Sequence, residues 1–194
     1  MTNPAVSIIV ATHDRPWELV VTLASLKVQT FHDFEVIVVH EPSTYHNVEQ
    51  ARQTTLGFGE QFRFEAYPER MNDWGNTAKH WAAKTHATGS MVGLINGDDY
   101  YCPLYLQIMS WPIRDGRADF TYCDFVTHNT RFQDVYRTKP EPAWIDGGGW
   151  LCKREIVADT EWNKEGSSPD GTFAEAIAKQ SRVEKVPGVL WMHC

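Results

Sequence analysis

Short apolar runs rich in β-branched residues constrain the fold of this chain more than any other feature. They occupy residues 6–11 (VSIIVA), 34–39 (FEVIVV) and 91–96 (MVGLIN). Continuous apolar runs of this length are typical of parallel strands that are buried on both faces. We therefore expect three buried strands in the first half of the chain.

Helical patterns separate these runs. Residues 16–29 carry apolar side chains at helical spacing after Pro16, and residues 74–87 do so before Gly89. Residues 62–67 alternate like a strand, and residues 45–58 are polar and only weakly helical. Alternating strands and helices predict a mostly parallel, Rossmann-like α/β sheet with ligands at the carboxyl ends of its strands.

The second half has a different pattern. Residues 119–128 and 131–137 predict a hairpin that turns at Asn129 and Thr130. A loop with three glycines at 147–149, a helix over 171–180 and a strand over 189–193 follow. We expect a smaller mixed β part here, within one domain spanning residues 1–194.

Composition excludes several classes of function. A net charge of −7 argues against a protein that binds nucleic acid through its phosphates. The sequence has neither an apolar run of about 18 residues nor a signal-peptide pattern at its start. The four cysteines form no CxxC pair, which argues against a zinc knuckle or a disulfide framework. We expect a cytoplasmic protein without a transmembrane segment.

The segment from Asn96 to Asp99 is the most informative part of the sequence for chemistry. Asp98 and Asp99 directly follow a predicted strand, and Gly97 would let the backbone approach a ligand closely. Carboxylate oxygens bind hard cations such as Mg²⁺ or Mn²⁺, and such a cation would bridge a diphosphate. The alternative is a turn with two solvated acids.

Two loops at the same predicted edge carry side chains suited to a nucleotide base. His13 follows the first strand, and Glu41 follows the second. A histidine ring can stack on a base, and Glu41 can accept the ring N–H of uracil or two donors of guanine. The alternative is that both are solvent-facing loop residues.

Four further side chains have a functional and a structural interpretation. Asp170 precedes a helix, where it would stay ionised as a base or serve only as an N-cap. His193 is a metal ligand or a structural histidine, and Lys79 contacts phosphates or lies on a solvated helix face. Trp150, beside the three glycines, stacks on a sugar ring or packs in the core.

The order and spacing of these signals resemble the family 2 type of GT-A glycosyltransferase over nearly the whole chain. Residues 6–15 (VSIIVATHDR) resemble its opening strand and T-Y-N-R loop, with His13 in the place of the base-stacking tyrosine. Residues 25–39 are similar to its S-x-x-x-Q…E-I-I-V-V segment, and residues 78–80 (AKH) to its A-R-N helix. Residues 96–99 (NGDD) lie on its D-x-D-D metal motif, and residues 147–149 resemble its glycine loop under the donor sugar.

The resemblance implies a GT-A fold and an inverting transferase that moves a sugar from a nucleotide diphosphate-sugar, UDP-sugar favoured, to an acceptor hydroxyl. Asp170 falls where the family has its catalytic base, and His193 matches a C-terminal histidine that ligates metal. Asp99 and His193 would bind Mn²⁺ or Mg²⁺. Residues 1–101 would form the donor half and residues 102–194 the acceptor half. The implied donor-binding residues are Ala11, His13, Arg15, Glu41, Lys79, Asn96, Gly97, Asp98, Gly148 and Trp150.

The sequence departs from the family pattern at three places. His40 and Glu41 stand where paired acids are usual, Asn96 replaces the first acid of D-x-D-D, and Pro169 replaces the acid before the base. These departures keep two alternatives open, a non-catalytic nucleotide-sugar or carbohydrate-binding module on the same fold and a metal-dependent sugar nucleotidyltransferase. A dinucleotide-dependent dehydrogenase is excluded because no G-x-G-x-x-G follows the first strand.

Overall fold

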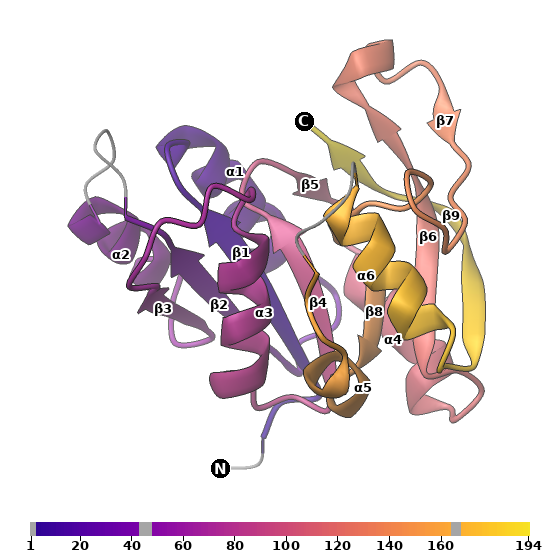
Figure 1. Cartoon of the computed structure of the whole chain (residues 1–194). Helices are drawn as coiled ribbons and strands as arrows, with labels where there is room; N and C mark the ends of the chain where they lie inside the picture. Colours follow the sequence, from indigo (N-terminus) through magenta and orange to yellow (C-terminus); the bar gives the residue numbers. More distant parts are fainter. Residues whose placement is uncertain (1–2, 43–47, 164–167) are drawn as a thin grey trace.

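A computed structural model describes residues 3–42, 48–163 and 168–194 and shows one mixed sheet between two layers of helices (Figure 1). The chain up to Asn96 contributes four parallel strands, β1 (Val6–Thr12), β2 (Phe34–His40), β3 (Phe62–Ala66) and β4 (Met91–Asn96). Their order is β3-β2-β1-β4, so the chain winds outward from β1 in both directions. The carboxyl ends of β1 and β4 are neighbours, as expected for a doubly wound sheet.

The remaining strands extend the same sheet. They are β5 (Tyr100–Tyr101), β6 (Phe120–Thr127), β7 (Val135–Tyr136), β8 (Trp150–Lys153) and β9 (Val183–His193). β8 pairs antiparallel with β4, β6 lies between β8 and β9, and β5 closes the far edge against β9. Two 3₁₀ turns, η1 (His128–Thr130) and η2 (Gly147–Gly149), follow β6 and precede β8.

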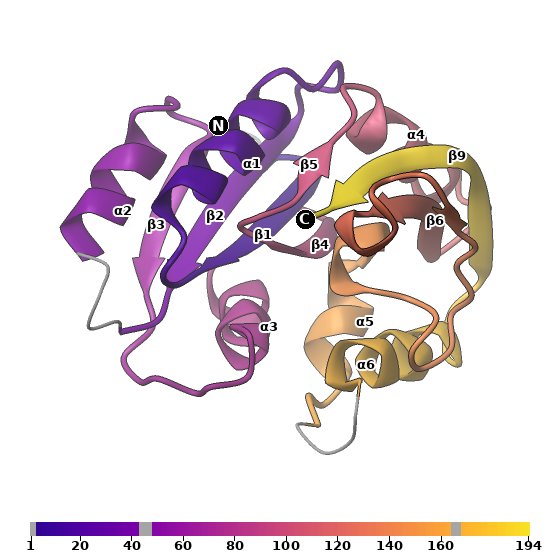
Figure 2. The same ribbon diagram turned by 90° about the horizontal axis from the view of Figure 1, so that it is seen from above.

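Helices cover both faces of the sheet (Figure 2). On one face lie α1 (Pro16–Lys27), α2 (Val48–Leu56) and α4 (Tyr105–Arg114), which pack on side chains such as Ile8 and Val10. On the other lie α3 (Asn76–Thr85), α5 (Arg154–Asp159) and α6 (Pro169–Ala178), which pack on Ile9 and Ile37. Alternate residues of each strand therefore face two separate cores, which explains why the strands read as continuous apolar runs.

The structure confirms the α/β architecture and the parallel strands of the first half. The predicted weak helix over residues 45–58 is α2, although residues 45–47 lie outside the described part. The hairpin is shorter than predicted, because the chain leaves β6 through η1 and two left-handed residues, Arg131 and Phe132, before β7 begins.

One predicted boundary is wrong, because β9 begins at Val183, six residues before the predicted strand. Three short elements, β5, β8 and α5, were not predicted. Among the described residues, no helix combines the length and the apolar character needed to cross a membrane.

Candidate functional site

Three side chains with metal-binding chemistry meet beyond the carboxyl end of β4. One ligand atom from each of Asp99, Asp146 and His193 lies within 4.8 Å of the other two. The Asp99 side chain is fully buried, and its Oδ1 lies 3.1 Å from His193 Nδ1. The pairing of β5 with β9 causes this meeting, because Tyr100 lies opposite Met192 and the flanking residues must then be neighbours.

Asp146 reaches the cluster from the turn that precedes β8. Its carboxylate accepts a hydrogen bond of 3.1 Å from the Gly148 N–H and so caps η2. A Cβ atom on Gly148 would lie 2.6 Å from Tyr101 Oη and 3.1 Å from Asp99 Oδ2. Only glycine therefore lets this turn approach Asp99.

Electrostatics at the cluster favour a cation. Burial raises the pKa of Asp99 to about 6, and the hydrogen bond with Asp99 raises the pKa of His193 to about 9. Burial and the nearby Asp170 raise the pKa of Asp146. Buried carboxylates that oppose one another's ionisation, with an imidazole beside them, fit a divalent cation in both charge and donor type.

Lys79 is buried beside this cluster rather than on a solvated helix face. Its ammonium donates a hydrogen bond of 2.7 Å to Asn96 Oδ1, and its exposed fraction is 2%. Burial lowers the pKa of Lys79, while Asp170 and Asp146 oppose this change. Asn96, which replaces the first acid of the D-x-D-D motif, is a neutral hydrogen-bond partner for Lys79. The positive charge of Lys79 is therefore not neutralised by Asn96 and can attract the surrounding carboxylates and any anion bound there.

The loops after β1 and β4 are tied together at the same edge. Arg15 forms an ion pair with Asp98. A Cβ atom on Gly97 would lie 2.7 Å from the Ala11 carbonyl oxygen, so the two backbones approach closely there. A Cβ atom on Gly75, directly before α3, would lie 2.5 Å from Ala11 Cβ, so this turn also packs closely against the end of β1.

Buried acceptor atoms without partners gather at the ends of β1 and β2. Glu41 is 5% exposed, and its Oε2 accepts a hydrogen bond of 3.3 Å from the Met71 N–H. Within the described part of the chain, Glu41 Oε1, Thr12 Oγ1 and Asp73 Oδ1 have no hydrogen-bond partner. Native proteins rarely leave such atoms unsatisfied, so they are candidate contacts for the N–H groups of a ligand. His13 lies beside them, with its Nε2 3.1 Å from Asp14 Oδ2.

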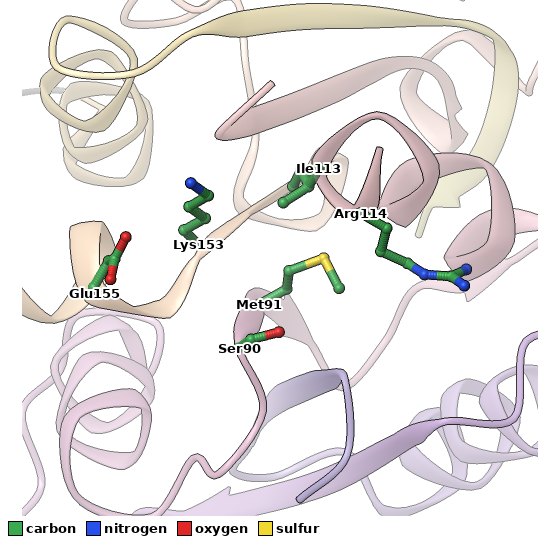
Figure 3. A pocket seen from close by; sticks show the side chains of 6 residues that line it. All are labelled: Ser90, Met91, Ile113, Arg114, Lys153 and Glu155. Atoms are coloured by element: carbon green, nitrogen blue, oxygen red, sulfur yellow. The ribbon is translucent and has the colours of Figure 1, made fainter. Parts of the chain in front are cut away.

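Asp170 lies in the same cavity as two residues of the candidate metal cluster, Asp146 and His193. The cavity has a volume of about 230 Å³, and Asp146, Asp170 and His193 all line it. Its remaining wall comes from β6, β7 and the turn before α6, with Phe125, Tyr136 and Ser168 among the lining residues. A second hollow, at the opposite end of β4, is lined by Ser90, Met91, Ile113, Arg114, Lys153 and Glu155 (Figure 3). It holds none of the predicted site residues.

Two findings change the predicted set of residues. Trp150 is 1% exposed and packs against Phe120 and Phe173, so it belongs to the core and has no ring face for a sugar. Asp146, in contrast, was not predicted. In the sequence, Asp146 is an acid directly before three glycines. This pattern indicates a turn, but it does not indicate that the turn lies next to Asp99.

Comparisons with known proteins identify the family of this chain. The sequence model of Glycosyl transferase family 2 matches residues 7–173. The chain belongs to this family. A comparison of the sequence with curated proteins finds no match.

Solved structures of glycosyltransferases share the fold. S. aureus TarS 1–349 is 18% identical with a TM-score of 0.78, over 100% of this chain and 60% of that one. The same TarS fragment in complex with UDP-GlcNAc is 20% identical with a TM-score of 0.75, over 99% of this chain and 58% of that one. Mannosyltransferase PcManGT from Pyrobaculum calidifontis, in complex with GDP-Man and Mn²⁺, is 21% identical with a TM-score of 0.77, over 100% of this chain and 57% of that one. The family 2 chain therefore has the GT-A fold and spans about three fifths of these structures.

Proposed function

We propose that this chain is a metal-dependent, inverting glycosyltransferase that uses a nucleotide diphosphate-sugar. The observation that carries the proposal is that Asp170 lines the same cavity as Asp146 and His193, two members of the cluster that Asp99 completes. A base and a cation-binding cluster side by side suit transfer to a hydroxyl with loss of a diphosphate. The complexes of related structures with UDP-GlcNAc and with GDP-Man and Mn²⁺ support this class of donor.

The donor would lie across the strand ends. The base would contact His13 and Glu41. Glu41 Oε1 is buried and has no hydrogen-bond partner among the described residues, so it would accept a ring N–H of the base. Asp98, held by Arg15, would accept hydrogen bonds from the ribose. Lys79 would bind a phosphate oxygen, because its ammonium already lies beside Asn96 at the end of β4.

Asp99, Asp146 and His193 would hold a divalent cation, which supplies Lewis-acid stabilisation to the leaving diphosphate. Asp170 would take the proton from an acceptor hydroxyl as its oxygen attacks the anomeric carbon. The bond from that carbon to the diphosphate oxygen breaks in the same step, so the configuration inverts. A carboxylate suffices as base because the hydroxyl becomes acidic only as the new bond forms.

A calorimetric titration tests the donor site. Full-length protein titrated with UDP, GDP and dTDP should bind one of them, UDP by our expectation, at least about tenfold more tightly with Mn²⁺ than without it. One order of magnitude corresponds to about 1.4 kcal/mol of coupling between metal and nucleotide. If no nucleoside diphosphate binds in a metal-dependent way, the proposal is wrong.

The variant Asp170→Asn separates catalysis from binding. It should lose about a hundredfold or more in sugar transfer and donor hydrolysis, since general-base catalysis contributes about 10²–10⁴-fold. Its affinity for the nucleoside diphosphate with Mn²⁺ should remain that of the wild type. A wild type that binds donor but never cleaves it would favour the alternative, a binding module on the same fold.

A further inference from the structure

The segment from Tyr136 to Ala143, here called the strap, begins at the end of β7, and its last residue contacts Ser168, directly before the first turn of α6 that carries Asp170. Its first part is fixed to β6 by one buried carboxylate. Asp124 accepts a hydrogen bond of 2.9 Å from the Thr138 N–H and pairs with Arg137 at 2.8 Å. Lys185 of β9 adds a bond of 3.1 Å to the Thr138 carbonyl. The start of the strap is therefore a fixed point relative to the sheet.

The end of the strap lies on the first turn of α6. The Tyr136 hydroxyl donates to the Ala143 carbonyl at 2.8 Å, and the Ala143 N–H donates to Ser168 Oγ at 3.3 Å. Ala143 has a left-handed φ of 64°, an unfavourable conformation for alanine that its surroundings must maintain. A chain of hydrogen bonds thus runs from β7 to the residue that precedes Pro169.

Gly171 makes this contact close. A Cβ atom there would lie 2.7 Å from Ser168 Oγ, 3.1 Å from the Ala143 nitrogen and 3.2 Å from Pro142 Cα. Backbone atoms of the strap therefore pack closely against Gly171, the residue after Asp170.

This contact matters because Asp170 stands in an unfavourable place. Asp146 and Asp170 line the same cavity, and like charges in a partly dehydrated site repel. Tyr136, Ala143 and Ser168 line that cavity as well, so the strap is part of its wall. A turn without such support would relax away from Asp146 and carry its carboxylate out of reach of the reacting hydroxyl.

We propose that the strap positions Asp170, with Tyr136 and Ser168 as the positioning residues, an inference that rests on the proposed role of Asp170 as base. Tyr136→Phe and Ser168→Ala each remove one hydrogen-bonding oxygen and leave the rest of the side chain. Displacing a reacting group by about 1 Å costs on the order of 10²-fold in rate, so these milder changes should lower kcat about tenfold.

The experiment measures release of UDP from UDP-N-acetylglucosamine and of GDP from GDP-mannose by the full-length protein with Mn²⁺. Tyr136→Phe and Ser168→Ala should lower kcat, leave KM for the donor unchanged and melt at the wild-type temperature. Ser168→Thr, which keeps an oxygen at this position, should restore the rate. In an Asp170→Asn background neither change should lower the rate further, because no base is left to position.

Matched controls are Tyr122→Phe on β6 and Ser181→Ala beyond α6. The Ser181 hydroxyl donates to the Ile177 carbonyl at 2.7 Å, at the opposite end of α6 from the strap contact. Both controls should keep the wild-type kcat.

Hydrogen exchange gives a second readout that needs no substrate. The amides of residues 170–173 should exchange faster in Tyr136→Phe and Ser168→Ala than in the wild type, while those of residues 174–178 stay unchanged. Wild-type rates and exchange in both variants would overturn the inference even if Asp170→Asn is inactive. An active Asp170→Asn, or a wild type that cleaves neither donor, would contradict the proposed function instead, and the exchange measurement then decides on the strap alone.

Discussion

Asp99 lies at the centre of the site because each of its oxygens has a different neighbour. Oδ1 faces His193 and accepts a hydrogen bond of 3.3 Å from the Cys194 N–H, and Oδ2 accepts one of 3.4 Å from the Tyr101 hydroxyl. A fully buried acid is stable only when its charge is compensated. His193 supplies part of this compensation, and the proposed cation would supply the rest.

Asp146 is the residue whose replacement tests this view most directly. In Asp146→Asn one anionic ligand becomes neutral while the shape of the turn is kept, since the amide oxygen can still accept the Gly148 N–H bond. We expect the increase in nucleotide affinity that Mn²⁺ provides to fall at least about tenfold. Replacing residues that only support metal ligands already lowers metal affinity by about 10- to 100-fold, so the loss of a ligand should cost at least the lower of these values.

The control for Asp146→Asn is Asp115→Asn. Asp115 pairs with Arg117 on the exposed end of α4 and touches none of the candidate ligands. Calorimetry at several Mn²⁺ concentrations separates metal affinity from nucleotide affinity. Unchanged metal dependence in Asp146→Asn would remove Asp146 from the ligand set.

The junction between β6, β9 and the strap depends on a single acid. Burial alone would raise the pKa of Asp124, but its hydrogen bonds with Lys185 and Arg137 outweigh this effect and lower the pKa from 3.8 to about 2. A carboxyl group whose pKa is depressed by folding stabilises the native state above its unfolded pKa. That stabilisation is lost as the pH falls through the folded pKa, here between about pH 4 and pH 2.

Asp124→Asn should therefore lose less stability on acidification than the wild type does. Because the Arg137 side chain is 74% exposed and screened by solvent, we expect a difference of only about 1 kcal/mol. Urea denaturation at pH 5 and at pH 2.5 measures it, with the exposed Asp134→Asn as control. Equal losses in the wild type and Asp124→Asn would contradict the assignment.

Elements with a strong local pattern were predictable, and elements defined by their partners were not. The strands β1, β2 and β4 are buried on both faces, so their composition alone identifies them. β5 has two residues and exists only because it pairs with β9. β9 begins with the half-exposed Val183, Glu184 and Lys185 and contains Pro187 and Gly188, which together hide its first half.

The site divides in the same way. Asp98, Asp99 and Asp170 stand in recognisable motifs at the ends of elements, where a position in the sequence implies a position in space. The place of Asp146 depends on how η2 folds against Tyr105, whose hydroxyl donates to the Gly148 carbonyl at 3.0 Å. Trp150 was misassigned because it lies beside the glycine turn in sequence while its side chain enters the core.

The whole molecule is built on one sheet, which the two predicted halves share. β4, within residues 1–101, pairs with β8, within residues 102–194, and the candidate ligand cluster takes Asp99 from the first range and Asp146 and His193 from the second. The division of labour between residues 1–101 and 102–194 stays a prediction. The candidate site lies where these two parts of the chain meet, along the pairing of β4 with β8, a boundary here called the seam.

That seam limits how the fold can be recombined. Gly93 on β4 has no room for a side chain, because a Cβ atom there would lie 2.7 Å from Leu151 Cδ2 on β8. A chimera joined near residue 101 would pair β4 of one parent with β8 of another. It would thereby change two close approaches at once, that of Gly93 to Leu151 and that of Gly148 to Asp99. Under the proposed function, we therefore expect acceptor preference to change more readily through substitutions in the strap and the turn after β6, which line the cavity with Asp170, than through exchange of halves.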